Sequence, residues 1–143
     1  MLIRIMHLAL TVLALAPTAP TDPAGAKIVG EWRGKSLCTN LKLSPACKDE
    51  TTRFVFTGPG AGSDTFHVVA DKLVAGSFAT MGEFDLEYGS AKGMWTHELD
   101  VPSCVKCMWW FRVEGAELVG GLTDGSGEAL RKVSAKRGDG PGN

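Results

Sequence analysis

Cys104 and Cys107 are separated by two residues in the sequence CVKC, which is the local motif of this chain most specific for a known chemistry. Such a pair supports thiol–disulfide exchange when one thiol has a low pKa, typically at the start of a helix. Here the sequence MWWF follows, which has the character of a strand. A haem attachment site would need a histidine after Cys107, where the chain has Met108. We therefore expect a structural disulfide in or near a turn, with redox chemistry as the weaker interpretation.

The other two cysteines, Cys38 and Cys47, flank a loop that contains Pro45. Their nine-residue separation is not that of a zinc knuckle, which argues against a four-cysteine metal site. Four cysteines allow three pairings, and the sequence does not choose among them. Local closure of each pair is the arrangement that we expect in an oxidising compartment.

Two of the histidines differ in their surroundings. His97 has the same phase as Trp95 and Leu99, so it faces the apolar side of its strand, either as a hydrogen-bonded core residue or as a ligand contact. His67 has the opposite phase to Phe66 and should be solvated.

The acidic residues Glu83, Asp85 and Glu87 share one face at a period of two, which is typical of a solvated stripe rather than of an acid–base pair. No grouping of serine, histidine and aspartate is discernible either. An enzyme is thus the least favoured class, and nothing in the sequence points to a cofactor or a metal.

The N-terminus has the pattern of a secretory signal. Arg4 precedes an apolar run from Leu8 to Ala16, which is shorter than the roughly 20 residues that span a bilayer. Small residues allow cleavage after Ala16 or after Ala26, and Pro17 makes the first site a poor substrate. We therefore expect a signal peptide at 1–26 and an exported protein, periplasmic or secreted.

The rest of the chain alternates between turn signals and strands with a period of two. Net charge is −1, and there is no lysine-rich or arginine-rich block, so neither nucleic acid nor a membrane surface is indicated for the mature protein. This pattern predicts an all-β domain at 27–137 and a disordered tail at 138–143. The expected strands are 28–38, 52–57, 64–72, 77–88, 92–101, 107–113, 117–123 and 128–137. Eight antiparallel strands joined by short turns can close into an up-and-down barrel without free edges.

Several segments resemble the small exported lipocalin-like, calycin-type β-barrel proteins of bacteria, most of which have no assigned function. The resembling segments are Gly30-x-Trp32-x-Gly34-x-Ser36-x-Cys38, Cys47-Lys48-Asp49-Glu50, Met81-Gly82, Trp109-x-Phe111-x-Val113-x-Gly115-x-x-Leu118-x-Gly120-x-Leu122 and Arg131-x-Val133. The resemblance implies that Trp32 closes the narrow end of the barrel under an arginine from the last strand. Arg137 is the favoured partner and Arg131 the alternative. The chain lacks the long C-terminal helix of typical lipocalins, which argues against a roomy cavity.

Two functions fit such a barrel. The first is a binding module for a small apolar or amphipathic ligand, with Tyr88, His97 and Arg131 as candidate polar contacts. The second is a protein-interaction module, like the periplasmic inhibitors of lysozymes or proteases, acting through Lys27–Gly30 or Thr39–Lys48. Trp110 faces outward by phase and could contact such a partner or fold over the barrel wall.

Overall fold

The computed structural model describes residues 23–138. Residues 1–22, which hold most of the predicted signal peptide, lie outside this range. Residues 139–143, which belong to the predicted disordered tail, lie outside it as well. A 3-10 turn, η1, precedes eight strands. Their bounds are η1 Ala26–Ile28, β1 Gly30–Cys38, β2 Glu50–Thr57, β3 Thr65–Val74, β4 Ser77–Gly89, β5 Met94–Val101, β6 Cys104–Glu114, β7 Glu117–Thr123 and β8 Ala129–Arg137. Within the described range no helix is long and apolar enough to cross a membrane.

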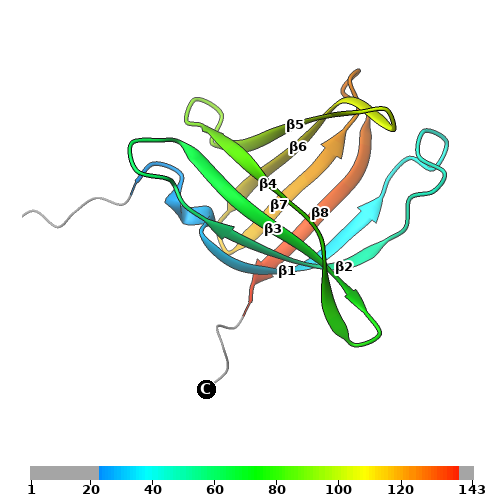
Figure 1. The fold of residues 1–143 in the computed structure, drawn as a ribbon, viewed down its shortest axis with the longest axis horizontal. Coiled ribbons are helices and arrows are strands. Elements are labelled where there is room, and N and C mark those ends of the chain that lie inside the picture. Colours follow the sequence, from blue (N-terminus) through cyan, green and yellow to red (C-terminus); the bar gives the residue numbers. More distant parts are fainter. Residues whose placement is uncertain (1–22, 139–143) are drawn as a thin grey trace, which may run out of the picture.

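The strands close into one antiparallel barrel in which each pairs with its neighbours in sequence (Figure 1). The closure joins β1 to β8, with pairs running from Trp32 opposite Arg137 to Cys38 opposite Arg131. Closure satisfies the backbone groups that an open sheet would leave at its edges. The predicted eight-stranded antiparallel up-and-down barrel is thus confirmed.

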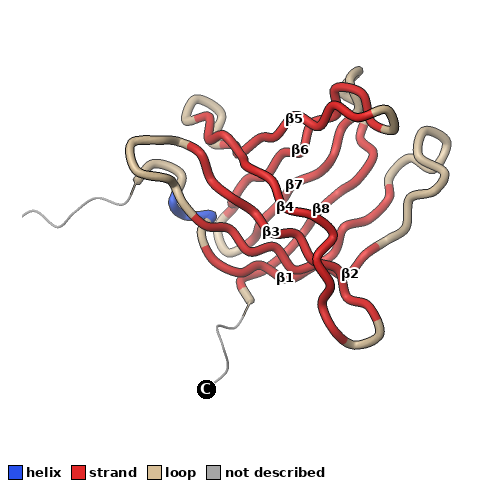
Figure 2. Tube along the Cα trace, in the orientation of Figure 1, coloured by secondary structure: helices blue, strands red, loops and turns tan. Residues whose placement is uncertain are grey.

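One end of the barrel is filled with side chains. Residues of alternating phase from the strands meet there in a single cluster: Ile28, Trp32, Phe54, Phe56, Phe66, Val68, Ala70, Leu86, Trp95, Phe111, Leu118, Val133 and Ala135. Turn η1 crosses this end and buries Ile28 completely. We call this filled end of the barrel the closed end. The opposite end, which we call the open end, carries the β1–β2, β3–β4, β5–β6 and β7–β8 connections (Figure 2).

The wall of the barrel is uneven between β4 and β5. These strands pair at only three positions, Glu87–Gly89 with Thr96–Met94, and they then diverge toward the open end (Figure 1). A β-bulge in the β3–β4 ladder at Ala70 and Asp71 accompanies this divergence. Bulges increase the local twist and bend a strand, which turns the first half of β4 away from β5.

Seven of the eight strands differ from the expected bounds by one to three residues, and Glu117–Thr123 agrees with them. The first expected strand begins at residue 28, but Ile28 belongs to η1 and the strand begins at Gly30. The expected turn around the CVKC motif is shorter than predicted, because Cys104 already pairs with Val101 at the start of β6.

Candidate functional site

A cavity of about 310 Å³ occupies the half of the barrel next to the open end. Seven of the eight strands contribute to it, and all of the lining residues but two are apolar or glycine. The lining residues are Ser36, Phe54, Ala70, Met81, Gly82, Phe84, Leu99, Trp109 and Arg131. Ligand pockets are typically about 300–1,000 Å³, so this one suits a small molecule.

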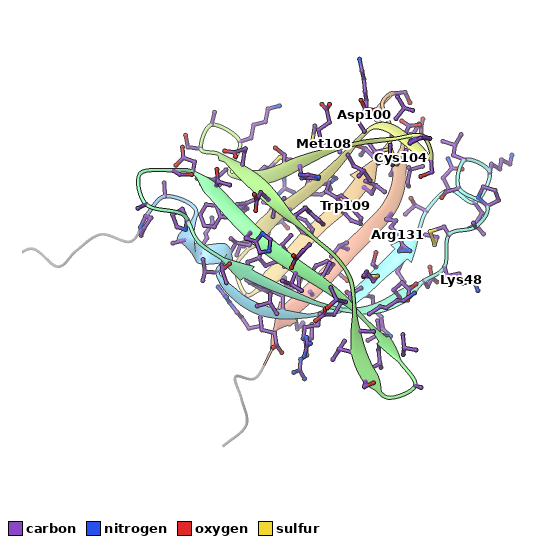
Figure 3. The ribbon with its side chains drawn as sticks, viewed as in Figure 1. Lys48, Asp100, Cys104, Met108, Trp109 and Arg131 are labelled. Atoms are coloured by element: carbon purple, nitrogen blue, oxygen red, sulfur yellow. A yellow bond between two sulfur atoms is a disulfide. The ribbon has the colours of Figure 1, made fainter. Side chains whose placement is uncertain are left out.

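Arg131 is the charged member of the lining. Its position on β8 has the inward phase of Val133 and Ala135, which places the guanidinium inside the wall. Nη1 donates to Ser36 Oγ at 2.9 Å and to the Ser36 carbonyl at 3.3 Å, and Nη2 donates to the Lys48 carbonyl at 2.6 Å. Figure 3 shows Arg131 and Lys48 at the same end of the barrel.

These partners leave the charge of Arg131 uncompensated. All three acceptors are neutral, and Arg131 forms no ion pair with any residue in the range 23–138. Guanidinium carries five N–H donors, so donors remain for a further acceptor. An apolar cavity with one unpaired cation favours a ligand that has an apolar body and an anionic or acceptor group.

The second predicted contact, His97, lies at the edge of the cavity rather than in its lining. Its Nδ1 donates to the carbonyl oxygen of Asp85 at 2.8 Å, across the place where β4 and β5 separate. Its ring lies 4.7 Å, centroid to centroid, from Phe84, which does line the cavity. His97 therefore does not line the cavity itself. It donates a hydrogen bond to the Asp85 backbone and packs against Phe84, which does line the cavity.

The third predicted contact, Tyr88, lies elsewhere. It packs against Trp95 at 4.7 Å and Phe66 at 6.4 Å between ring centroids, within the closed end. A Cβ added at Gly25 would approach the Tyr88 ring to 2.8 Å. The structure thus brings Arg131 and His97 to the cavity region, but it does not bring Tyr88 there.

Trp32 and Arg137 both lie at the closed end. Trp32 is buried, and its Nε1 donates to the Ile28 carbonyl at 2.7 Å. The Arg137 Cζ lies 4.0 Å from the centre of the Trp32 ring, and its guanidinium also donates to the carbonyls of Lys27 and Val29. The alternative partner, Arg131, is at the other end of β8.

The cysteines are joined in the two local pairs. Cys38 and Cys47 have an S–S distance of 2.08 Å, and Cys104 and Cys107 one of 2.05 Å. Both disulfides lie at the open end, where the first ties the β1–β2 connection to β1. Cys107 is buried against Leu122 and Leu130, in a small cluster beside Trp109.

Among the nine lining residues, Arg131 alone was expected from the sequence as a ligand contact, and Ser36, Met81 and Trp109 illustrate why the other eight were not. Trp109 has the inward phase of Phe111 and stacks against it at 6.1 Å, so its phase was a usable signal. Ser36 has the same inward phase as Trp32 and is 3% exposed. Its partner Arg131 is distant in sequence and meets it only through the pairing of β1 with β8, so the sequence around Ser36 does not indicate the contact. Met81 lies in the β3–β4 bulge, which the local sequence does not specify.

The open end is also apolar on its outer rim. Most of the large hydrophobic side chains that remain exposed in the described chain lie on the loops and strand ends there, and Met81 lies at the β4 bulge. The full set is Leu37, Leu41, Leu43, Leu73, Val74, Met81, Val101 and Val105. Trp110, by contrast, is half-buried on the outer wall, with the Arg112 Cζ 5.9 Å from its ring centre.

No protein-family model and no curated protein matches the chain. Among solved structures, it is similar to a mutant of the fluorescent protein UnaG, with 18% sequence identity and a TM-score of 0.43. The alignment covers 78% of this chain and 96% of that chain.

Proposed function

We propose that this chain is an exported binding module whose barrel holds one small amphipathic molecule at the open end. The observation that carries the proposal is an apolar cavity of about 310 Å³ with Arg131 as its charged lining residue. The ligand's apolar body contacts Phe84, Leu99 and Trp109, and its acidic or acceptor group accepts hydrogen bonds from Arg131. Two disulfides on the same end are compatible with an oxidising compartment.

The matched pair octanoate and octanol tests this proposal, because the two differ mainly in the carboxylate. Titration calorimetry should show that octanoate binds more tightly. Arg131→Met, which keeps length and removes charge, should weaken octanoate about 10- to 100-fold, the usual range for a charge-assisted hydrogen bond. Octanol is the control: its affinity should change little. Equal losses for both ligands, or no binding of either, would contradict the proposal.

A second candidate function, a protein-interaction module, is favoured by the Thr39–Lys48 loop. Leu41 and Leu43 are 59% and 54% exposed there, and apolar loop residues are typical anchors of an interface. Native mass spectrometry of protein purified from its host distinguishes the two functions. A co-purifying protein that is lost in the Leu41→Ser, Leu43→Ser variant would favour interaction, and a retained small molecule would favour ligand binding.

A further inference from the structure

The gap between β4 and β5 exposes two strand edges inside an otherwise closed barrel. Beyond the last pair, Glu87 with Thr96, the segment Gly82–Asp85 is paired with β3 alone. On β5, the residues His97–Leu99 and Val101 are paired with β6 alone. An unpaired edge presents N–H and C=O groups that can accept another strand. The two edges diverge from their last pair toward the open end (Figure 1).

The hydrogen bond of His97 shows which backbone groups face this opening. A carbonyl oxygen can only accept, so His97 Nδ1 donates to Asp85, and the Asp85 backbone must point toward β5. In a strand, the backbone groups of successive residues point to opposite sides. Those of Glu83 therefore face the gap as well, with no strand partner there among the described residues.

The inner side of the gap is apolar. Met81, Gly82 and Phe84 on one edge and Leu99 on the other line the cavity described above. A segment that enters the gap in extended conformation would direct every second side chain into this lining.

The outer side of the gap is acidic. Glu83 and Asp85 on β4, and Glu98 and Asp100 on β5, have the outward phase and are exposed. His67 on β3 is the titratable base in contact with the β4 pair, with Nδ1 2.8 Å from Asp85 Oδ1 and Nε2 3.7 Å from Glu83 Oε2.

The β5 carboxylates have few partners of their own. Asp100 accepts the backbone N–H of Lys106 at 3.1 Å, and Glu98 lies opposite Met108 on β6. A second copy of the same edges would bring like charges together, which disfavours self-association through the gap. The acidic border instead selects an occupant of positive charge.

We propose that the β4–β5 gap binds an extended, cationic segment of a partner protein by strand addition. Backbone hydrogen bonds to the free edges provide the affinity, and alternate side chains provide the specificity. Lysine or arginine side chains face Glu83, Asp85, Glu98 and Asp100, and small apolar side chains between them face the cavity. This inference rests on the strand edges and does not depend on whether the cavity holds a small molecule.

Two capped peptides of identical composition test it on the full, ligand-free protein: Lys-Val-Lys-Val-Lys-Val-Lys and Lys-Lys-Lys-Lys-Val-Val-Val. Both carry the same charge, but only the first presents cationic and apolar faces as a strand. The alternating peptide should bind more tightly, by about tenfold or more, in fluorescence anisotropy. Equal affinity would mean that the acidic border attracts cations without strand pairing, and the proposal would fail.

Charge is tested with the variant Glu83→Gln, Glu98→Gln and a matched control, Glu114→Gln, Glu117→Gln, on the distant β6–β7 hairpin. The first variant removes two exposed carboxylates, and an exposed ion pair contributes about 0.2–1 kcal/mol, so it should lose about two- to thirtyfold in affinity for the alternating peptide. The control should lose less than about twofold. Thermal unfolding of both variants checks that the fold is intact. Equal losses in the two variants would overturn the proposed location.

Hydrogen exchange locates the peptide directly. Bound alternating peptide should slow exchange of the Glu83 and Asp85 amides and of amides in His97–Val101. Protection confined to other strands, such as the outer wall around Trp110, would contradict strand addition in the gap. Protection of the gap that grows with protein concentration in the absence of peptide would instead assign it to a second copy of the chain.

Discussion

At the scale of single residues, His67 is held between two carboxylates on the outer wall. The hydrogen bond to Asp85 raises the pKa of His67 above its usual 6.5, with further raising by the charges of Asp85 and Glu83. The protonated form is therefore favoured in the folded state. Its contribution to stability is present below about pH 6.5 and is lost as the pH rises through the raised pKa. Because 42% of the His67 side chain is exposed to solvent, this contribution should be small.

NMR titration of the His67 ring protons should thus give a pKa above 6.5, and Asp85→Asn should move it back toward 6.5. A His67 pKa that is unchanged by Asp85→Asn would show that the ion pair does not form in solution.

Trp32 fills the closed end of the barrel and should contribute strongly to stability. Its ring is buried, is covered by Arg137 and donates a hydrogen bond, so Trp32→Ala should cost about 3–5 kcal/mol of unfolding free energy. Trp110→Ala should cost clearly less, because Trp110 is half-buried on the outer wall. Urea unfolding of both variants measures the difference. Equally small losses would show that Trp32 does not close the barrel.

The phase of a residue was predictable from sequence, but its height in the barrel was not. Phe84 and Tyr88 share one phase on β4, yet Phe84 lines the cavity and Tyr88 packs in the closed end. Period-two alternation identifies which side chains point inward. It cannot say which end η1 fills, because that depends on Ile28 packing against residues distant in sequence. Two of the three candidate contacts therefore lie near the cavity and the third does not.

At the scale of elements, the strands were predictable because each alternates between clear turn signals. The divergence of β4 from β5 was not, because it accompanies a bulge at Ala70 and Asp71 and the curvature needed for closure. Asp71 is buried there, with Arg53 Nη2 at 2.7 Å and the Thr80 hydroxyl at 2.8 Å from its carboxylate. These partners come from β2 and β4, so no local pattern reveals them.

Each disulfide closes a short segment of the chain at the open end. Peptide mapping under non-reducing conditions should link Cys38 to Cys47 and Cys104 to Cys107. Cys38→Ser with Cys47→Ser should lower the unfolding free energy by about 2–3 kcal/mol, because the bridge restricts the unfolded chain. Four free thiols in the denatured protein, or another pairing, would contradict this arrangement.

At the scale of the whole molecule, the proposed export would account for the apolar run Leu8–Ala16 and for the two disulfides together. Expressed in a bacterium with its leader, the protein should be found outside the cytoplasm without Arg4 and the Leu8–Ala16 run. Intact mass distinguishes cleavage after Ala16 from cleavage after Ala26. A cytoplasmic product that keeps the leader would contradict export.

The barrel as a whole is filled at one end and hollow at the other, and ligand binding in the hollow end is the central claim. A crystal structure of the protein grown with octanoate would show where the ligand binds. The carboxylate should lie within hydrogen-bond distance of the Arg131 guanidinium, with the alkyl chain along Phe84 and Trp109. Octanoate bound only on the outer surface, or a cavity filled by the protein's own side chains, would contradict it.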